Sequence, residues 1–130
     1  MKKILLIDDN PMNNNGYIQP LKQKYDVVVV MSIIAAKRKL RFHKFDLIII
    51  DIMMPTPGVQ CTDELSTGLY FYSEEIQPKF PKTPVLFWSN LNHEKYDNYF
   101  NRQSPSNVNF LHKNYENEKH LLEKVTEIFA

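Results

Sequence analysis

The sequence is poor in cysteine, in excess charge and in long apolar runs. Its one cysteine, Cys61, cannot form an internal disulfide, which favours a reducing compartment and argues against a structural zinc site. With 16 basic and 15 acidic residues, the formal net charge of +1 creates no strong attraction to nucleic acid or to an anionic membrane. No apolar run approaches the roughly 20 residues that span a membrane. We therefore expect a cytoplasmic protein that neither inserts into a membrane nor binds nucleic acid directly.

Five short apolar runs recur along the chain. They comprise residues 4–7, 27–31, 47–50, 85–88 and 108–111. The runs lack sustained alternation with polar residues, which indicates strands that are buried on both faces of a sheet. The intervening stretches are long enough for helices, and several carry apolar residues at helical spacing. The pattern predicts one α/β domain over residues 1–130, a doubly wound parallel sheet with helices on both faces.

Two segments depart from this regular pattern. Pro20 falls in the interior of the first expected helix, where it would cost about 3 kcal/mol, so we expect that helix to be short, to begin late or to be kinked. The stretch from Thr56 to Leu65 is rich in turn residues and predicts a long loop soon after Asp51. Such a loop is either a functional segment or a neutral insertion, and the sequence leaves both interpretations open.

Carboxylates stand where two of the apolar runs end. Asp8 and Asp9 follow the run 4–7, and Asp51 follows the run 47–50. Ligands of parallel sheets bind at the carboxyl ends of the strands, so we expect these side chains to converge. Clustered carboxylates repel one another unless a cation neutralises them, and Mg²⁺ takes oxygen ligands. The pattern predicts a magnesium site, with helix capping as the alternative role for Asp9.

Two other strand ends carry groups that bind anions. Ser89 follows the run 85–88 and offers a hydroxyl, while Lys113 comes shortly after the run 108–111 and offers an ammonium. Each is a common residue in its position. Together with the three carboxylates, however, they form a specific set at one edge of the predicted sheet.

With this set, the chain resembles the receiver domains of bacterial two-component response regulators over essentially its whole length. The resemblance implies a flavodoxin-like, five-stranded sheet with the strand order 2-1-3-4-5. It also implies that Asp51 attacks the phosphorus of a phosphohistidine on a histidine kinase or a histidine phosphotransfer protein, forming an acyl phosphate. An aspartate is ordinarily ionised at pH 7, so this acceptor needs no general base.

The resemblance assigns roles to the residues around Asp51. It implies that Asp9 ligates Mg²⁺ directly, Asp8 mainly through water, and Met53 through its backbone carbonyl. Lys113 would neutralise charge on the phosphoryl group, which is the main catalytic requirement of phosphoryl transfer.

The resemblance also implies a switch. Ser89 would move toward the phosphoryl oxygens and Phe110 would follow, although plain core packing is the alternative role for Phe110. The movement would bias the face formed by the fourth helix, the fifth strand and the fifth helix. A downstream protein partner would bind there, and a phosphorylation-dependent dimer is a further use of this face. Tyr96, Tyr99 and Phe100 share one side of that fourth helix and serve either the core or such a partner.

Four residues differ from the family pattern. Asn90 stands where a small residue usually leaves the acceptor open, and Asn114 stands where a proline usually follows the lysine. Met53 and Leu91 occupy positions that tune hydrolysis, and because both are apolar, neither can orient an attacking water. We therefore expect slow loss of phosphate.

These differences keep a second hypothesis open, a receiver-fold interaction module that works without phosphorylation. In either case the chain would not be a multiple-turnover enzyme on an external substrate, although it would catalyse its own phosphorylation and slow dephosphorylation. A haloacid-dehalogenase-type phosphatase is disfavoured because Met53 stands where that family needs an acid. A flavodoxin-like electron carrier is disfavoured because Asp8 and Asp9 would repel its phosphate. The histidines at 43, 93, 112 and 120 show no ligand spacing, so we interpret them as surface or packing residues.

Overall fold

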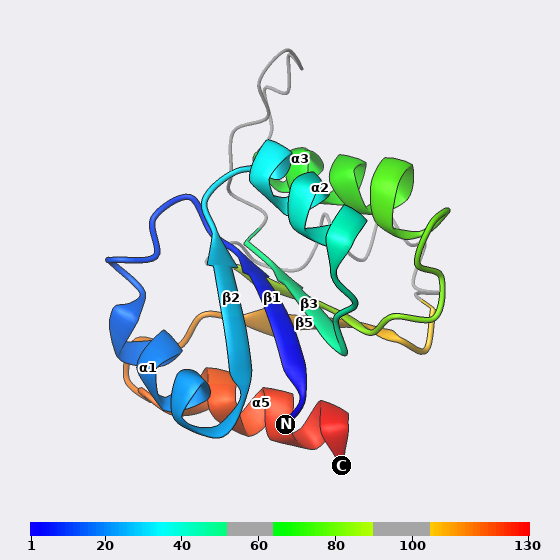
Figure 1. Ribbon diagram of the computed structural model, residues 1–130. Helices are drawn as coiled ribbons and strands as arrows, with labels where there is room; N and C mark the ends of the chain where they lie inside the picture. Colours follow the sequence, from blue (N-terminus) through cyan, green and yellow to red (C-terminus); the bar gives the residue numbers. More distant parts are fainter. Residues whose placement is uncertain (52–63, 90–104) are drawn as a thin grey trace.

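The computed structural model describes residues 1–51, 64–89 and 105–130, and within them five strands form one parallel sheet (Figure 1). The strands are β1 (Lys3–Ile7), β2 (Asp26–Val30), β3 (Leu47–Ile50), β4 (Val85–Ser89) and β5 (Val108–His112). Their order across the sheet is β2-β1-β3-β4-β5. The predicted fold class and strand order are therefore confirmed. The second strand ends one residue earlier than the apolar run 27–31, because Met31 is an exposed bend residue.

Helices cover both faces of the sheet. They are α1 (Asn15–Lys24), α2 (Ile33–Phe42), α3 (Glu64–Phe71), the π-helical turn η1 (Tyr72–Ile76) and α5 (His120–Phe129). The helices α1 and α5 lie on one face, and α2 and α3 lie on the other (Figure 1). Because α3 begins at Glu64, the predicted loop 56–65 is wrong at its end, and its other residues up to 63 lie outside the described part of the chain. No helix in the described part is long and apolar enough to cross a membrane.

Alternating side chains of the strands build a separate core on each face. In β1, Leu5 and Ile7 pack with α2 and α3, whereas Ile4 and Leu6 pack with α1 and α5. All four side chains are fully buried. Burial on both faces explains why the strands read as continuous apolar runs rather than alternating ones.

The first helix begins late, which is one of the three outcomes expected from Pro20. It starts at Asn15, and Pro20 lies inside it without an N–H to donate to the carbonyl of Gly16. The connection between β1 and α1 is a turn, in which the Asn14 N–H donates to the Pro11 carbonyl at 3.1 Å. That connection carries Asn10 and Asn14 past the end of the sheet, where the acidic residues lie.

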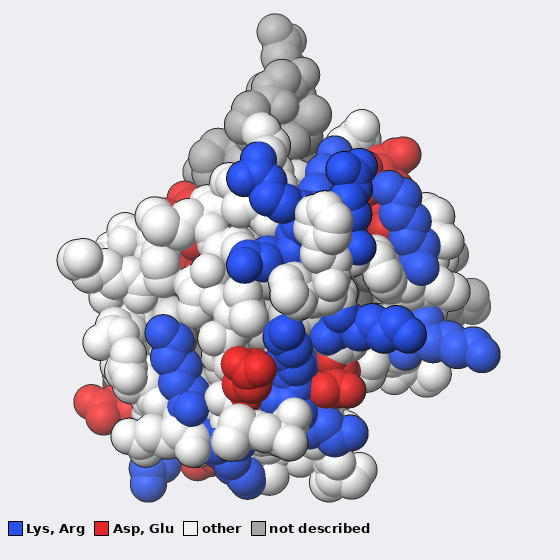
Figure 2. All heavy atoms as spheres, viewed as in Figure 1, with Lys and Arg blue, Asp and Glu red and all other residues white. Residues whose placement is uncertain are grey.

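Basic side chains gather over α2 (Figure 2). They surround a hollow of about 540 Å³ between α2 and η1. Glu75 lines this hollow and forms two ion pairs, from its Oε1 to Lys37 Nζ at 3.2 Å and from its Oε2 to Lys79 Nζ at 2.7 Å. The Lys37 pair fastens α2 to η1 on the face away from α5, whereas the Lys79 pair is local to η1 and the turn that follows it.

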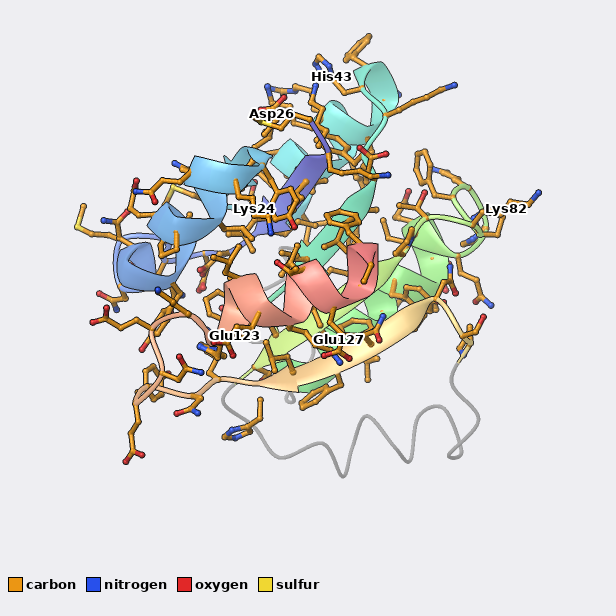
Figure 3. The ribbon with its side chains drawn as sticks, turned by 90° about the horizontal axis from the view of Figure 1, so that it is seen from below. Lys24, Asp26, His43, Lys82, Glu123 and Glu127 are labelled. Carbon is orange, nitrogen blue, oxygen red and sulfur yellow. The ribbon has the colours of Figure 1, made fainter. Side chains whose placement is uncertain are left out.

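The fifth helix closes the opposite face beside α1, as the view from below shows (Figure 3). Tyr25 at the end of α1 contacts Phe129 with ring centroids 5.3 Å apart, and Lys2 lies 5.5 Å from the centroid of the same Phe129 ring. Glu123 and Glu127 lie one helical turn apart on α5 (Figure 3). The two ends of the chain therefore lie near each other, remote from the carboxyl ends of the strands.

Candidate functional site

Three carboxylates converge at the carboxyl end of the sheet. Asp8, Asp9 and Asp51 each offer an oxygen, and these oxygens lie within 4.8 Å of one another. Asp8 and Asp51 are buried, whereas Asp9 is exposed. Parallel pairing sets the positions, because the Asp51 N–H donates to the Ile7 carbonyl at 2.9 Å and so places Asp51 beside Asp8. Sequence reasoning predicts these three residues together, and the structure brings them together.

Asp8 is held by two donors from the connection that follows it. The Asn10 N–H donates to Asp8 Oδ1 at 3.0 Å, and the Asn14 side-chain amide donates to Asp8 Oδ2 at 2.6 Å. Asn14 is itself buried and is the N-cap residue of α1, yet its side chain makes no capping hydrogen bond. The sequence analysis missed this role of Asn14. The asparagine cluster at 13–15 was the available signal, but it does not indicate which amide reaches the carboxylate.

Lys113 supplies the positive charge of the site. Its Nζ lies 3.2 Å from Asp51 Oδ2, and both side chains are almost fully buried. The same ammonium lies 4.6 Å from the centroid of the Trp88 ring, within the range of a cation–π contact. The residue after it, Asn114, therefore does not displace Lys113 from Asp51.

Ser89 and Phe110 occupy neighbouring strands next to the site. Ser89 is fully buried at the end of β4, and its carbonyl accepts a 2.7 Å hydrogen bond from the Lys113 N–H. Phe110 is partly buried against the core on the α2 side of the sheet. The predicted residues Met53, Asn90, Leu91, Tyr96, Tyr99 and Phe100 lie outside the described residues.

The donor set fits a hard divalent cation. The three carboxylates present only oxygen, which Mg²⁺ prefers, and two of them are removed from bulk solvent by burial. Lys113 offsets part of the negative charge of this cluster through its ion pair with Asp51. The remaining carboxylates leave the cluster negative, so binding of a cation would relieve their repulsion.

His120 is a second residue that the sequence analysis missed, because the interpretation as a packing histidine describes only its burial. It lies at the start of α5, and its ring accepts the indole N–H of Trp88 at 3.0 Å and the backbone N–H of Asn114 at 3.2 Å. A buried tryptophan N–H usually requires a partner, which was the only sequence signal for such a contact.

The fold and the site define a class of α/β domain with an acidic site at the carboxyl edge of a five-stranded parallel sheet, and comparison with known proteins identifies the family. The model of the response regulator receiver domain matches residues 4–126. Since this match covers nearly all of the chain, the protein belongs to the response regulator receiver domain family, as its resemblance predicts. A search of curated proteins gives no match.

Solved structures agree with this assignment. The response regulator TrrA of Thermotoga maritima, in complex with Mg²⁺ and BeF, is 25% identical with a TM-score of 0.73, covering 98% of this chain and 99% of that chain. The chemotaxis protein CheY4 of Vibrio cholerae is 22% identical with a TM-score of 0.74, covering 98% of each chain. The receiver domain of HemR from Leptospira biflexa is 21% identical with a TM-score of 0.75, covering 100% of this chain and 95% of that chain. The latter two similarities concern the fold.

Proposed function

We propose that residues 1–130 form a single receiver domain in which Asp51 accepts a phosphoryl group from a phosphohistidine. The donor would be a histidine kinase or a histidine phosphotransfer protein. The observation that carries this proposal is the 3.2 Å contact between Lys113 Nζ and Asp51 Oδ2, beside the acidic cluster. The buried Asp51 carboxylate thus contacts the Lys113 ammonium, which can bind an anion, and belongs to the acidic cluster, which can bind a cation. A carboxylate that accepts a phosphoryl group needs both kinds of charge neutralisation.

The transfer forms one bond and breaks another. A carboxylate oxygen of Asp51 bonds to phosphorus, the bond between phosphorus and the donor imidazole nitrogen breaks, and the electron pair stays on the imidazole. Lys113 would shift from the carboxylate toward the phosphoryl oxygens, because both are anions within reach of one ammonium. Bound Mg²⁺ would supply further neutralisation of the phosphoryl charge.

The environments of the two neighbouring aspartates suit different roles. Asp8 is fully buried, and each of its oxygens already accepts a hydrogen bond. Asp9 is exposed. This difference supports direct ligation of Mg²⁺ by Asp9 and ligation mainly through water by Asp8. The backbone carbonyl of Met53 completes the proposed set from outside the described residues.

Phosphorylation would be communicated through Ser89 and Phe110. Ser89 lies buried at the end of β4, and Phe110 lies on the adjacent strand, paired in register with Phe87. A shift of Ser89 toward the phosphoryl group would open space for Phe110. The surface that would respond includes β5 and α5, where a downstream partner or a second copy would bind.

A small-molecule phosphodonor with Mg²⁺ tests this function. Acetyl phosphate should add the mass of one phosphoryl group to the wild type and leave Asp51→Asn unmodified. Equal mass gain in Asp51→Asn would show that the acceptor is another residue. An unmodified wild type, beside a receiver that is labelled under the same conditions, would instead favour an interaction module that works without phosphorylation. If label is gained, its loss should be slow, because Met53 and Leu91 cannot orient a water.

A further inference from the structure

Trp88 contacts both the Lys113 ammonium of the site and His120, the first residue of α5. It is the only tryptophan, fully buried in β4 directly before Ser89. Lys113 Nζ lies 4.6 Å from the centroid of its ring, while the indole N–H donates to His120 Nε2 at 3.0 Å. The indole thus lies between Lys113 and the first residue of α5.

The same nitrogen of His120 receives a second donor. The backbone N–H of Asn114, the residue that follows Lys113, donates to His120 Nε2 at 3.2 Å. Because Nε2 accepts two N–H groups, it carries the lone pair, and Nδ1 carries the proton. Nδ1 then donates to the Asn117 carbonyl at 2.8 Å. Three hydrogen bonds therefore fix the tautomer and the orientation of one buried ring.

The two residues that donate to His120, Asn114 and Trp88, each contact a different part of Lys113. One comes from Asn114, so it fixes the backbone just after Lys113. The other comes from Trp88, whose ring face supports the Lys113 ammonium. The Lys113 N–H is in turn bonded to the Ser89 carbonyl at 2.7 Å. Both the main chain and the charged end of Lys113 are therefore tied to groups that His120 orients.

We propose that His120 is a positioning residue that holds Lys113 beside Asp51 through Asn114 and Trp88. The role of Lys113 in phosphoryl transfer rests on the function proposed above, but the positioning itself does not. The Asn114 N–H is partly buried and needs an acceptor, and the indole N–H is fully enclosed. Removal of the ring acceptor would leave both donors unpaired and would release Lys113.

Three substitutions separate positioning from mere packing. His120→Leu removes the acceptor, whereas His120→Gln can place an amide oxygen near the position of Nε2. The variant His120→Leu with Asn114→Pro removes the acceptor together with one of the two donors, since proline has no N–H. Val125→Ala is the matched control, because Val125 is a fully buried residue of α5 whose side chain has no polar atom to accept either N–H, so its loss should only lower stability.

The first measurement is the Mg²⁺-dependent rate of Asp51 phosphorylation by acetyl phosphate. His120→Leu should slow it by about 10- to 100-fold, the effect of a misplaced catalytic group. His120→Gln should recover most of the rate, the double variant should recover part of it, and Val125→Ala should match the wild type. Equal rates in His120→Leu and Val125→Ala, under conditions where both are folded, would overturn the proposal.

The second measurement does not require phosphorylation. NMR of the Trp88 indole N–H and the Asn114 amide should show both resonances shifted and exchanging faster with solvent in His120→Leu, but not in Val125→Ala. Unchanged resonances would refute the positioning role even if the wild type accepts phosphate. If the wild type accepts none, the proposed function fails, and these two resonances alone still decide the role of His120.

Discussion

The side-chain amide of Asn14 donates a 2.6 Å hydrogen bond to Asp8 Oδ2. Both residues are buried, and six positions separate them in the sequence. The late start of α1 makes this contact geometrically available, because Asn14 is the N-cap residue of α1 and its side chain makes no capping hydrogen bond.

Asn14→Ala should destabilise the fold by about 1.5–3 kcal/mol, the usual range for a hydrogen bond to a charged group. The physical reason is that a buried carboxylate oxygen of Asp8 loses its amide donor. Urea unfolding without Mg²⁺ measures the change. Asn13 is an exposed neighbour whose side chain makes no hydrogen bond within the described part of the chain, so Asn13→Ala should change stability little. Equal effects of the two variants would contradict the prediction.

Mg²⁺ should stabilise the fold, because the three carboxylates converge only in the folded chain. At a free concentration of 100 times Kd, the gain is about 2.7 kcal/mol. Urea unfolding with Mg²⁺ and after chelation measures this gain. It should shrink strongly in Asp9→Asn and persist in Asp26→Asn, an exposed carboxylate at the start of β2. A gain that is the same in both variants would place the cation elsewhere.

Lys113→Met should have opposite effects on stability and on Mg²⁺ affinity. Loss of one partner leaves Asp51 buried without its cation, a change that typically costs about 3–5 kcal/mol. Removal of a positive charge beside the cluster should also tighten Mg²⁺ binding, which calorimetric titration measures. Lys124→Met breaks only a surface pair with Glu127 and should cost at most about 1 kcal/mol. Weaker Mg²⁺ binding in Lys113→Met would show that Lys113 does not repel the ion.

Stability should fall as His120 becomes protonated. Burial lowers the pKa of His120 below its usual 6.5, and the nearby charge of Lys113 lowers it further, against opposing effects of the Asn117 carbonyl and Glu123. The ring of Tyr17 on α1 also packs against it. The unfolded chain therefore binds the proton of His120 more readily than the folded chain does. The stability contributed by neutral His120 is complete above the pKa of the unfolded state and is lost as pH falls through the lower pKa of the folded state. Urea unfolding across this range should show a steeper loss in the wild type than in His120→Gln, and parallel curves would contradict the prediction.

Glu75→Gln should weaken the attachment of η1 to α2. The hydrogen bond from Lys79 lowers the pKa of Glu75 below its usual 4.5, and Lys37 adds to this effect while burial opposes it. The ionised Glu75 carboxylate therefore stabilises the fold above the pKa it has in the unfolded chain. This stabilisation is lost as pH falls through its lower pKa in the folded chain. The loss at neutral pH should be at most about 1 kcal/mol, since both lysines are largely exposed. Thermal unfolding at low and high salt measures it, with exposed Glu74→Gln as the control; a loss that does not shrink with salt would argue against an electrostatic origin.

The sequence predicts the sheet because burial on both faces leaves a direct pattern in the chain. Four aliphatic residues before Asp8 and four before Asp51 indicate strands, and the polar residues at their ends indicate one edge of the sheet. Pro20 predicts a short, late or kinked first helix for an equally local reason, its missing N–H, and α1 begins late at Asn15. The end of the loop before α3 was mispredicted because Ser66, Thr67 and Gly68 favour helix weakly. The buried Leu69 and Phe71 of the same segment anchor α3 to the core.

The sequence by itself therefore determined which strands form and which charged residues end them. Tertiary structure decided how those residues are held. The amide that reaches Asp8, and the ring that connects Trp88 to Asn114, depend on where α1 and α5 begin relative to the sheet. Trp88 and His120 are 32 positions apart, and their contact exists only once α5 packs on the face that carries Trp88. Such hydrogen bonds require donor and acceptor to meet at about 3 Å with a defined angle, and periodicity along a chain cannot encode that geometry.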